Sequence, residues 1–190
     1  VLSALVLAFP PLIKPFTYQS VIIPMLPDKM DNFLEAPVPF VVGTINLPEN
    51  IPDDVIIVNA IEDNVLSHEP IVDLPKLDEL ERKCLGFVNE LKESFGGELP
   101  FTTTKLQRQL VDSICTVFET HFDSLFANFH NYTICDMSDP LTRVSVFMKD
   151  SFLDDIEPEE IPFLEPFIET QAFFEYSDHR LRRRDNIDTK

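Results

Sequence analysis

Short apolar runs dominate the first third of the chain and predict a small sheet. Residues 21–23, 40–42 and 55–58 are fully apolar, rich in β-branched side chains and bounded by turn-forming residues. Such runs are typical of strands that are covered on both faces. Residues 46–54 are rich in Pro, Asn and acidic side chains, and therefore predict a surface loop between the second and third strands.

Helical patterns alternate with these strands. The apolar residues 1–9 predict a buried helix that stops at Pro10-Pro11, since neither proline has an amide to donate. Pro27 followed by Asp28 suits the first turn of a short helix through Leu34. The alternation favours an α/β layer with at least partly parallel pairing. Two or three strands do not make a stable sheet alone, so we expect further strands upstream of Val1.

From Leu74 the hydrophobic period becomes helical. A first helix is predicted up to Gly96-Gly97, which would act as its C-cap. Thr104 is the expected N-cap of the longest helix, which extends through Phe129. Its expected apolar stripe consists of Leu106, Leu110, Val111, Ile114, Val117, Phe118, Phe122, Leu125, Phe126 and Phe129.

Two more helices are predicted near the end of the chain. Asp139-Pro140 should open one that continues to about Leu153, and Pro166 should lie in the first turn of the other. The expected inward side chains are Val144, Phe147 and Met148 in the first, and Phe167, Ile168, Ala172 and Phe174 in the second. We therefore predict an α/β segment at residues 1–73 and a helical segment at residues 74–190, both within one structural lobe.

Composition and charge narrow the classes of function. Hydrophobic residues make up 44% of the 190 residues, and 17 Phe with no Trp predict a globular interior rich in Phe packing. A formal charge of −18 repels phosphate backbones and anionic membrane surfaces, which argues against nucleic acid as a partner. The apolar run at residues 1–9 is too short for a membrane span, so no direct membrane insertion is expected.

Charged residues concentrate in two places near the C-terminal end. Between Ser151 and His179 there are nine Asp and Glu and no Lys or Arg. Such a run most often forms a solvated face, and an attachment site for a basic partner is the alternative interpretation. The cluster of Arg180, Arg182, Arg183 and Arg184 is interpreted as a solvated helix end, although it could touch an acidic surface.

Motifs for chemistry are absent from the sequence. Four glycines cannot compose a phosphate-binding loop, and no nucleophile elbow or H-E-x-x-H motif occurs. Three widely spaced cysteines indicate free thiols in a reducing cytosol, with no zinc spacing. His121 and His130 are nine residues apart and are interpreted as surface or boundary residues. We therefore expect no catalytic residues, no metal site and no cofactor.

Two stretches of the chain resemble a known family. Residues 12–27, LIKPFTYQSVIIPMLP, and residues 33–43, FLEAPVPFVVG, resemble the central segment of DENN domains. In that family a helix ends in Tyr/Phe-Pro, an aromatic-Gln strand leads to a Pro-x-Leu-Pro turn, and Ala-Pro-x-Pro-aromatic starts the next strand. Here Pro24, Pro37, Pro39 and Gly43 match this pattern, and they are interpreted as determinants of backbone geometry.

The end of the chain carries a second matching motif. Residues 151–153, 162–164 and 167–173, the last reading F-I-E-T-Q-A-F, resemble the downstream end of the same domain. They are most similar to its Rab-interacting subgroup, and Gln171 belongs to this ending. The resemblance thus extends from the central to the downstream DENN segments, although residues 68–139 match only in helical pattern.

The resemblance implies a guanine-nucleotide exchange factor for a Rab-family small GTPase in vesicle trafficking. It implies the larger lobe of a bilobed module: a Rossmann-like layered sheet, incomplete in this chain, followed by an α-helical region. A longin-like upstream lobe would be a further partner within the same protein. The implied location is cytoplasmic, with peripheral recruitment to vesicle or endomembrane surfaces. Because the upstream lobe is not in this chain, residues 1–190 alone are expected to show weak or no exchange activity.

The GTPase-binding residues are expected at the carboxyl ends of the strands, where ligands usually approach open α/β sheets. These positions are Pro27, Asp28, Asn46, Glu62 and Asp63. A non-catalytic Rab effector or scaffold with the same fold is the alternative. Folliculin-like relatives, which promote GTP hydrolysis through an arginine, are a third and less favoured comparison, since no arginine lies in a glycine-rich loop.

Overall fold

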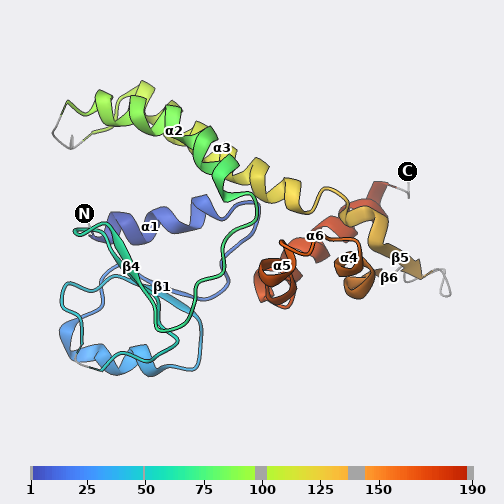
Figure 1. The fold of residues 1–190 in the computed structure, drawn as a ribbon, viewed down its shortest axis with the longest axis horizontal. Coiled ribbons are helices and arrows are strands. Elements are labelled where there is room, and N and C mark those ends of the chain that lie inside the picture. The colour runs from blue at the N-terminus through green and yellow to red at the C-terminus, as the bar shows by residue number, and fades with distance from the viewer. Residues whose placement is uncertain (1, 49, 97–101, 137–143, 188–190) are drawn as a thin grey trace. The chain divides into compact units, whose positions relative to one another are not determined.

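The computed structural model describes residues 2–48, 50–96, 102–136 and 144–187 (Figure 1). The chain divides into two compact units. Unit 1 comprises Val1–Pro10 and Gln19–Val72, and unit 2 comprises Pro11–Tyr18 and Asp73–Lys190. Helices and strands both occur, and the strands that are described form three separate two-stranded sheets. The prediction of a mixed α/β fold is therefore confirmed.

Unit 1 begins with helix α1 (Leu2–Leu12), which continues past the predicted stop at Pro10-Pro11 by one residue. The fixed φ of proline is itself helical, so two prolines can close a last turn although they donate no hydrogen bond. Strand β1 (Val21–Ile23) follows, and the 3₁₀ helix η1 (Asp28–Glu35) occupies the predicted position after Pro27. Strand β2 (Phe40–Val42) pairs with β1 in parallel, with Val21 opposite Phe40. The predicted parallel pairing is confirmed.

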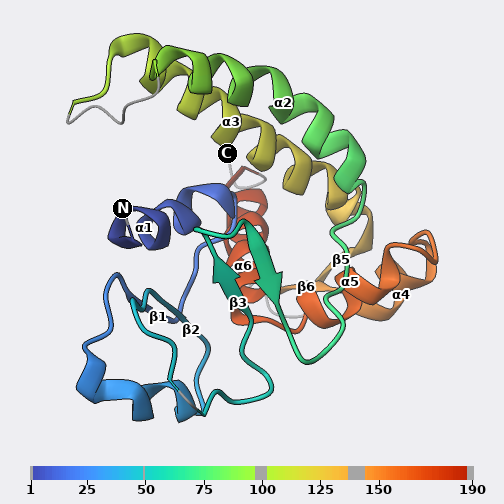
Figure 2. The same ribbon diagram turned by 60° about the vertical axis from the view of Figure 1, so that its left-hand side comes forward.

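A β-hairpin completes unit 1 (Figure 2). Strand β3 (Ile57–Asn59) overlaps the third predicted strand, residues 55–58, and pairs antiparallel with a strand that the pattern did not indicate, β4 (Asn64–Leu66). The expectation of strands covered on both faces is wrong for the described residues. Val21 is 39% exposed and Val58 is 72% exposed, because a sheet of two strands leaves faces and edges open.

Unit 2 contains the predicted pair of long helices, α2 (Leu77–Ser94) and α3 (Lys105–Leu125), which lie side by side in both views (Figures 1 and 2). Thr104 caps α3 as predicted, in a capping box with Gln107. Gly96 adopts a φ of +57° just after α2, as the predicted C-cap requires, and Gly97 lies outside the described residues.

The predicted length and stripe of α3 need correction. The helix ends at Leu125, and the chain turns through a short 3₁₀ helix, η2 (Phe129–Tyr132), because Phe126 and Phe129 leave the helical register to enter the core. Leu106 is 48% exposed and Val111 is 45% exposed, so the predicted stripe is wrong at these two positions.

The prediction of a helix from Asp139-Pro140 to Leu153 is wrong for residues 144–147 and confirmed for residues 149–153. Strand β5 (Thr133–Asp136) pairs antiparallel with strand β6 (Val144–Phe147), and only α4 (Lys149–Asp154) is helical. Residues 139–143 lie outside the described residues. The run V-S-V-F alternates with the period of a strand, and Phe147 stacks on Phe129 at 4.7 Å between ring centroids.

Two helices end unit 2, α5 (Ile161–Phe167) and α6 (Gln171–Ile187). Pro166 lies inside α5 and does not start the final helix, contrary to the prediction. Phe174, expected to be buried, is 66% exposed, whereas Phe173 is 1% exposed. The predicted buried side is therefore wrong at Phe174, whereas Ile168 is buried and Phe167 and Ala172 pack against the core as expected.

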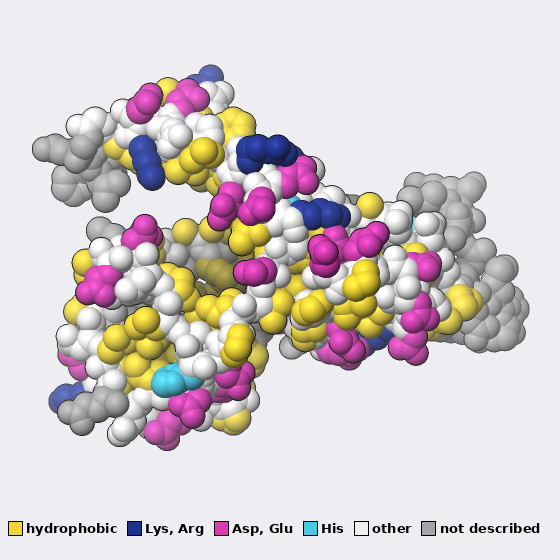
Figure 3. Space-filling model, in the orientation of Figure 1, with side chains coloured by type: hydrophobic (Ala, Val, Ile, Leu, Met, Phe, Trp, Pro, Cys, Tyr) yellow, Lys and Arg dark blue, Asp and Glu magenta, His cyan; other side chains and the backbone are white. Residues whose placement is uncertain are grey.

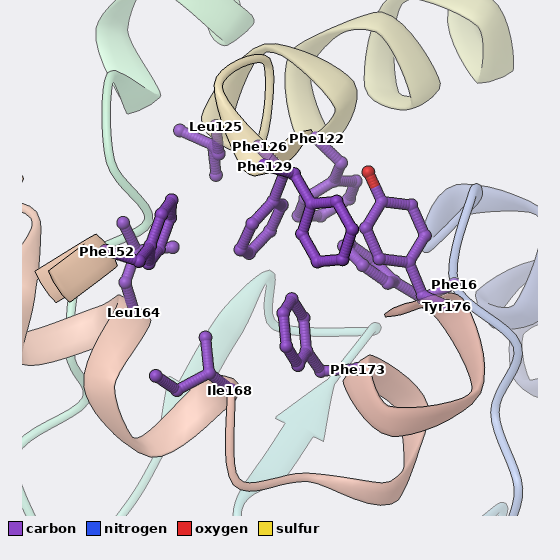
Figure 4. Packing of buried hydrophobic residues seen from close by; sticks show 10 residues of the cluster. All are labelled: Phe16, Phe122, Leu125, Phe126, Phe129, Phe152, Leu164, Ile168, Phe173 and Tyr176. Carbon is purple, nitrogen blue, oxygen red and sulfur yellow. The ribbon is translucent and has the colours of Figure 1, made fainter. Parts of the chain in front are cut away.

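The core of unit 2 is built from aromatic side chains, as the Phe content predicted (Figure 4). Phe126 is at its centre, fully buried, with the centroids of five other aromatic rings within 6.0 Å of its own. Aromatic pairs in such arrangements contribute about 0.5–1.5 kcal/mol each beyond area burial. The cluster comprises Phe16, Phe122, Leu125, Phe126, Phe129, Phe152, Leu164, Ile168, Phe173 and Tyr176.

Of the helices that are described, none is both long and apolar enough to cross a membrane.

Candidate functional site

The carboxyl ends of β1 and β2 lie at the same edge of their sheet, because the two strands are parallel. Backbone hydrogen bonds continue past the strands on this edge. The Gly43 amide donates to the Ile23 carbonyl at 3.0 Å, and the Leu26 amide donates to the Gly43 carbonyl at 2.7 Å. Leu26 is buried, so the two loops that leave the strands start from fixed positions.

Gly43 is packed too closely to carry a side chain. A Cβ at this position would lie 2.7 Å from the Pro24 carbonyl oxygen and 2.9 Å from side-chain carbons of both Leu2 and Val6. The glycine thus lets helix α1 and the turn after β1 approach the end of β2. This packing supplies a physical reason for Pro24 and Gly43 in the sequence motif.

Three of the five predicted GTPase-binding residues lie together beyond this edge. The Asn46 Nδ2 donates to the Asp28 Oδ1 at 3.4 Å, and Pro27 is the N-cap of η1 immediately before Asp28. Thr44 fixes the second loop through a 2.6 Å hydrogen bond from its Oγ1 to the Asn46 carbonyl. Both Asp28 and Asn46 are exposed. The pair therefore presents hydrogen-bond acceptors and one carboxylate to a macromolecular partner.

The other two predicted residues, Glu62 and Asp63, form the turn of the β3–β4 hairpin. Asn59 Oδ1 accepts hydrogen bonds from the Ile61 and Glu62 amides at 3.1 and 3.2 Å. Glu62 Oε2 in turn accepts from the side-chain amides of Asn59 and Asn64 at 3.1 and 3.4 Å. These hydrogen bonds stay within the hairpin, so none of them joins Glu62 to the Asp28–Asn46 pair.

The remaining motif residues lie at the surface. Pro37 and Pro39 are exposed, and they flank a tight turn in which the Val38 amide donates to the Ala36 carbonyl at 2.8 Å. Gln171 is exposed at the first position of α6. Its neighbour Thr170, whose Oγ1 accepts a hydrogen bond from the Phe173 amide at 3.2 Å, was not predicted. A threonine directly before an apolar helical pattern is a typical N-cap signal and could have been recognised.

His121 is buried in unit 2, so its interpretation as a surface or boundary residue is wrong. It is 4% exposed, and its Nε2 has no hydrogen-bond partner among the residues that the structure describes. Burial lowers the pKa of His121, and a hydrogen bond to the Pro75 backbone opposes this effect. Within the described ranges, no three or more His, Cys, Asp and Glu side chains are grouped to hold a metal ion.

Arg180 is not a solvated helix end. Its guanidinium pairs with Asp123 and lies 4.6 Å from the centroid of the Tyr176 ring. Burial raises the pKa of the Tyr176 hydroxyl, so this residue stays neutral beside the pair. Arg182 pairs with Asp178 one helical turn away, and the side chains of Arg183 and Arg184 lie outside the description.

The acidic run of residues 151–179 is partly compensated within unit 2. Lys149 pairs with Glu169 at 2.7 Å, and Lys76 pairs with Glu160 at 2.9 Å. Figure 3 shows other acidic side chains at the surface of this unit. Whether a basic partner binds there stays a prediction.

A comparison with known protein families finds a match to the first third of the chain. Residues 1–63 match the family model described as the DENN (AEX-3) domain. No curated protein matches the chain. The matched segment contains α1, the β1–β2 pair, Gly43 and all five predicted GTPase-binding residues. The resemblance to a DENN domain is thus confirmed there, and the Rab-interacting subgroup stays a prediction.

Proposed function

We propose that this chain, whose residues 1–63 belong to a DENN (AEX-3) domain, is part of a guanine-nucleotide exchange factor for a Rab-family small GTPase. The observation that carries the proposal is the coincidence of two features in that segment. The family match covers the carboxyl edge of the β1–β2 pair, and Asp28 and Asn46 meet in solvent at that edge. Open α/β sheets commonly bind their ligands there.

Nucleotide exchange requires a binding surface of the right shape, and no covalent bond is made or broken. A factor that binds the nucleotide-free GTPase more tightly than the nucleotide-bound form weakens nucleotide affinity by the same coupling free energy. A thousandfold effect corresponds to ~4.1 kcal/mol of differential binding. The proposed contact residues are Pro27, Asp28, Asn46, Glu62 and Asp63.

Further partners follow from the proposal. A longin-like upstream lobe of the same protein completes the GTPase-binding surface, and the protein acts in the cytoplasm on vesicle or endomembrane surfaces to which it is recruited peripherally.

The test is release of fluorescent GDP from a panel of Rab proteins by the full-length protein that contains this chain. We expect faster release from at least one Rab, and a slower response when Asp28→Ala and Asn46→Ala are combined. Asp31→Ala is the matched control, since Asp31 is an exposed carboxylate on the same 3₁₀ helix. Flat release curves across the panel would refute the proposal.

A non-catalytic effector is the alternative function, and a pull-down with the same full-length protein distinguishes it from an exchange factor. An effector would retain the GTP-bound form in a pull-down and would leave GDP release unchanged. An exchange factor retains the nucleotide-free form.

A further inference from the structure

The β3–β4 hairpin, whose turn carries the proposed contact residues Glu62 and Asp63, also exposes an apolar surface. Val58 and Val65 are directly opposed across the hairpin, and they are 72% and 52% exposed. Ile56, which precedes β3, is 54% exposed, and Ile61 in the turn is 96% exposed. Single exposed apolar side chains are ordinary, whereas an opposed pair beside a fully projecting isoleucine forms a patch that a partner can bury.

The turn that carries Ile61 is ordered by its own hydrogen bonds. Asn59 Oδ1 holds the Ile61 and Glu62 amides, and the Glu62 carboxylate ties the Asn59 and Asn64 side chains together. Asp63 adopts a φ of +53°, which aspartate tolerates better than most residues. A turn whose backbone is already held in this way loses little backbone entropy on binding.

Charge identifies the kind of surface that would cover this patch. From Lys29 to Lys76 the intervening sequence has nine Asp and Glu residues and no Lys or Arg. Figure 3 shows acidic and hydrophobic side chains interspersed over this unit, with few cationic ones. A second copy of the chain, an anionic membrane and nucleic acid would all be repelled. A protein surface with an apolar recess and a basic rim is complementary.

We propose that the β3–β4 hairpin is an anchoring and specificity element for the small GTPase, with Ile61 inserted into an apolar recess that lysine or arginine side chains border. The inference rests on the proposed function for the class of its partner. Asp63 supplies the charge that faces the basic rim, and Glu62 holds the turn in shape. Apolar residues that anchor interfaces in this way carry a large share of binding energy.

The test measures binding of the full-length protein to the nucleotide-free GTPase that responds in the release assay. Burial of an isoleucine side chain predicts that Ile61→Ser weakens affinity by about tenfold or more. Ile71→Ser is the control, because Ile71 is also an exposed isoleucine of unit 1 but lies outside the hairpin. Both variants should melt like the parent protein, since neither side chain belongs to the buried core.

A second variant tests the charge. Asp63→Asn keeps a side chain that tolerates positive φ and removes the carboxylate. It should slow association and reduce the dependence of the association rate on salt.

The outcomes separate this inference from the proposed function. Exchange by the parent protein together with an Ile61→Ser affinity within about twofold of it would overturn the anchoring role alone. A parent protein that binds no GTPase would overturn both. Loss of a dimer in Ile61→Ser, with GTPase binding intact, would assign the patch to a second copy and also overturn the inference.

Discussion

Replacement of Gly43 by alanine should destabilise unit 1 by about 2 kcal/mol. The added Cβ would meet the Pro24 carbonyl oxygen at 2.7 Å and the Leu2 and Val6 side chains at 2.9 Å. Overpacking of this kind costs about 1–3 kcal/mol, and the upper end applies because one obstacle is backbone. The two hydrogen bonds of Gly43 also restrain it from moving away. Alanine also lowers the conformational entropy of the unfolded chain, which offsets about 0.4–1 kcal/mol of this cost.

Hydrogen exchange of the full-length protein, resolved by peptide, is the appropriate assay because it reports on each segment separately. A loss of about 2 kcal/mol should speed exchange of the β1 and β2 amides by roughly 30-fold. Gly86→Ala is the matched control, since Gly86 is exposed within α2 and its Cβ would meet nothing within 4 Å. That substitution should stabilise α2 by about 0.8–1 kcal/mol. Unchanged or slower exchange of β1 and β2 in Gly43→Ala would refute the packing argument.

Three further substitutions test individual elements. Thr104→Ala should lower the stability of α3 by about 1 kcal/mol in urea denaturation, because it removes the capping box, while Thr102→Ala should change little. Pro37→Ala should lower stability by about 0.4–1 kcal/mol, because alanine gives the unfolded chain more conformational freedom than proline does. GDP release should stay unchanged, since the exposed Pro37 is interpreted as a determinant of backbone geometry. Slower GDP release with unchanged stability would instead make Pro37 a contact residue. Because burial lowers the pKa of His121 below 6.5, the unfolded state binds more protons, so stability should be constant above about pH 7 and fall as the pH drops below 6.5. His121→Phe should flatten this dependence between about pH 7.5 and 5.5, and an unchanged slope would contradict the assignment.

Local signals in the sequence identified those elements whose cause is local. Thr104 with Gln107, the glycine after α2 and the Pro27-Asp28 start of η1 were predicted because capping and proline geometry act within a few residues. The parallel β1–β2 pair followed from apolar runs separated by a helical pattern. The rule that open α/β sheets bind ligands at the carboxyl ends of their strands then indicated an edge of that pair.

Features that depend on tertiary packing were not predictable in the same way. The V-S-V-F run at β6 is too short for its period to distinguish strand from helix, and its assignment depends on contact between Phe147 and Phe129. The burial of His121 depends on packing against residues far away in the sequence, including Pro75. The hydrogen bonds of Asn59 and Glu62 hold the turn that carries Ile61, and a sequence pattern does not reveal that this isoleucine remains in solvent.

An exchange factor must bind the nucleotide-free GTPase more tightly than the GDP-bound GTPase, and the predicted contact residues are proposed to supply this difference in affinity. The most direct measurement is the dissociation constant of the full-length protein for the responsive Rab in its nucleotide-free and GDP-bound states. The account predicts binding to the nucleotide-free form that is tighter by about a thousandfold, which is ~4.1 kcal/mol. Equal affinity for the two states, or a preference for the GTP-bound form, would contradict it.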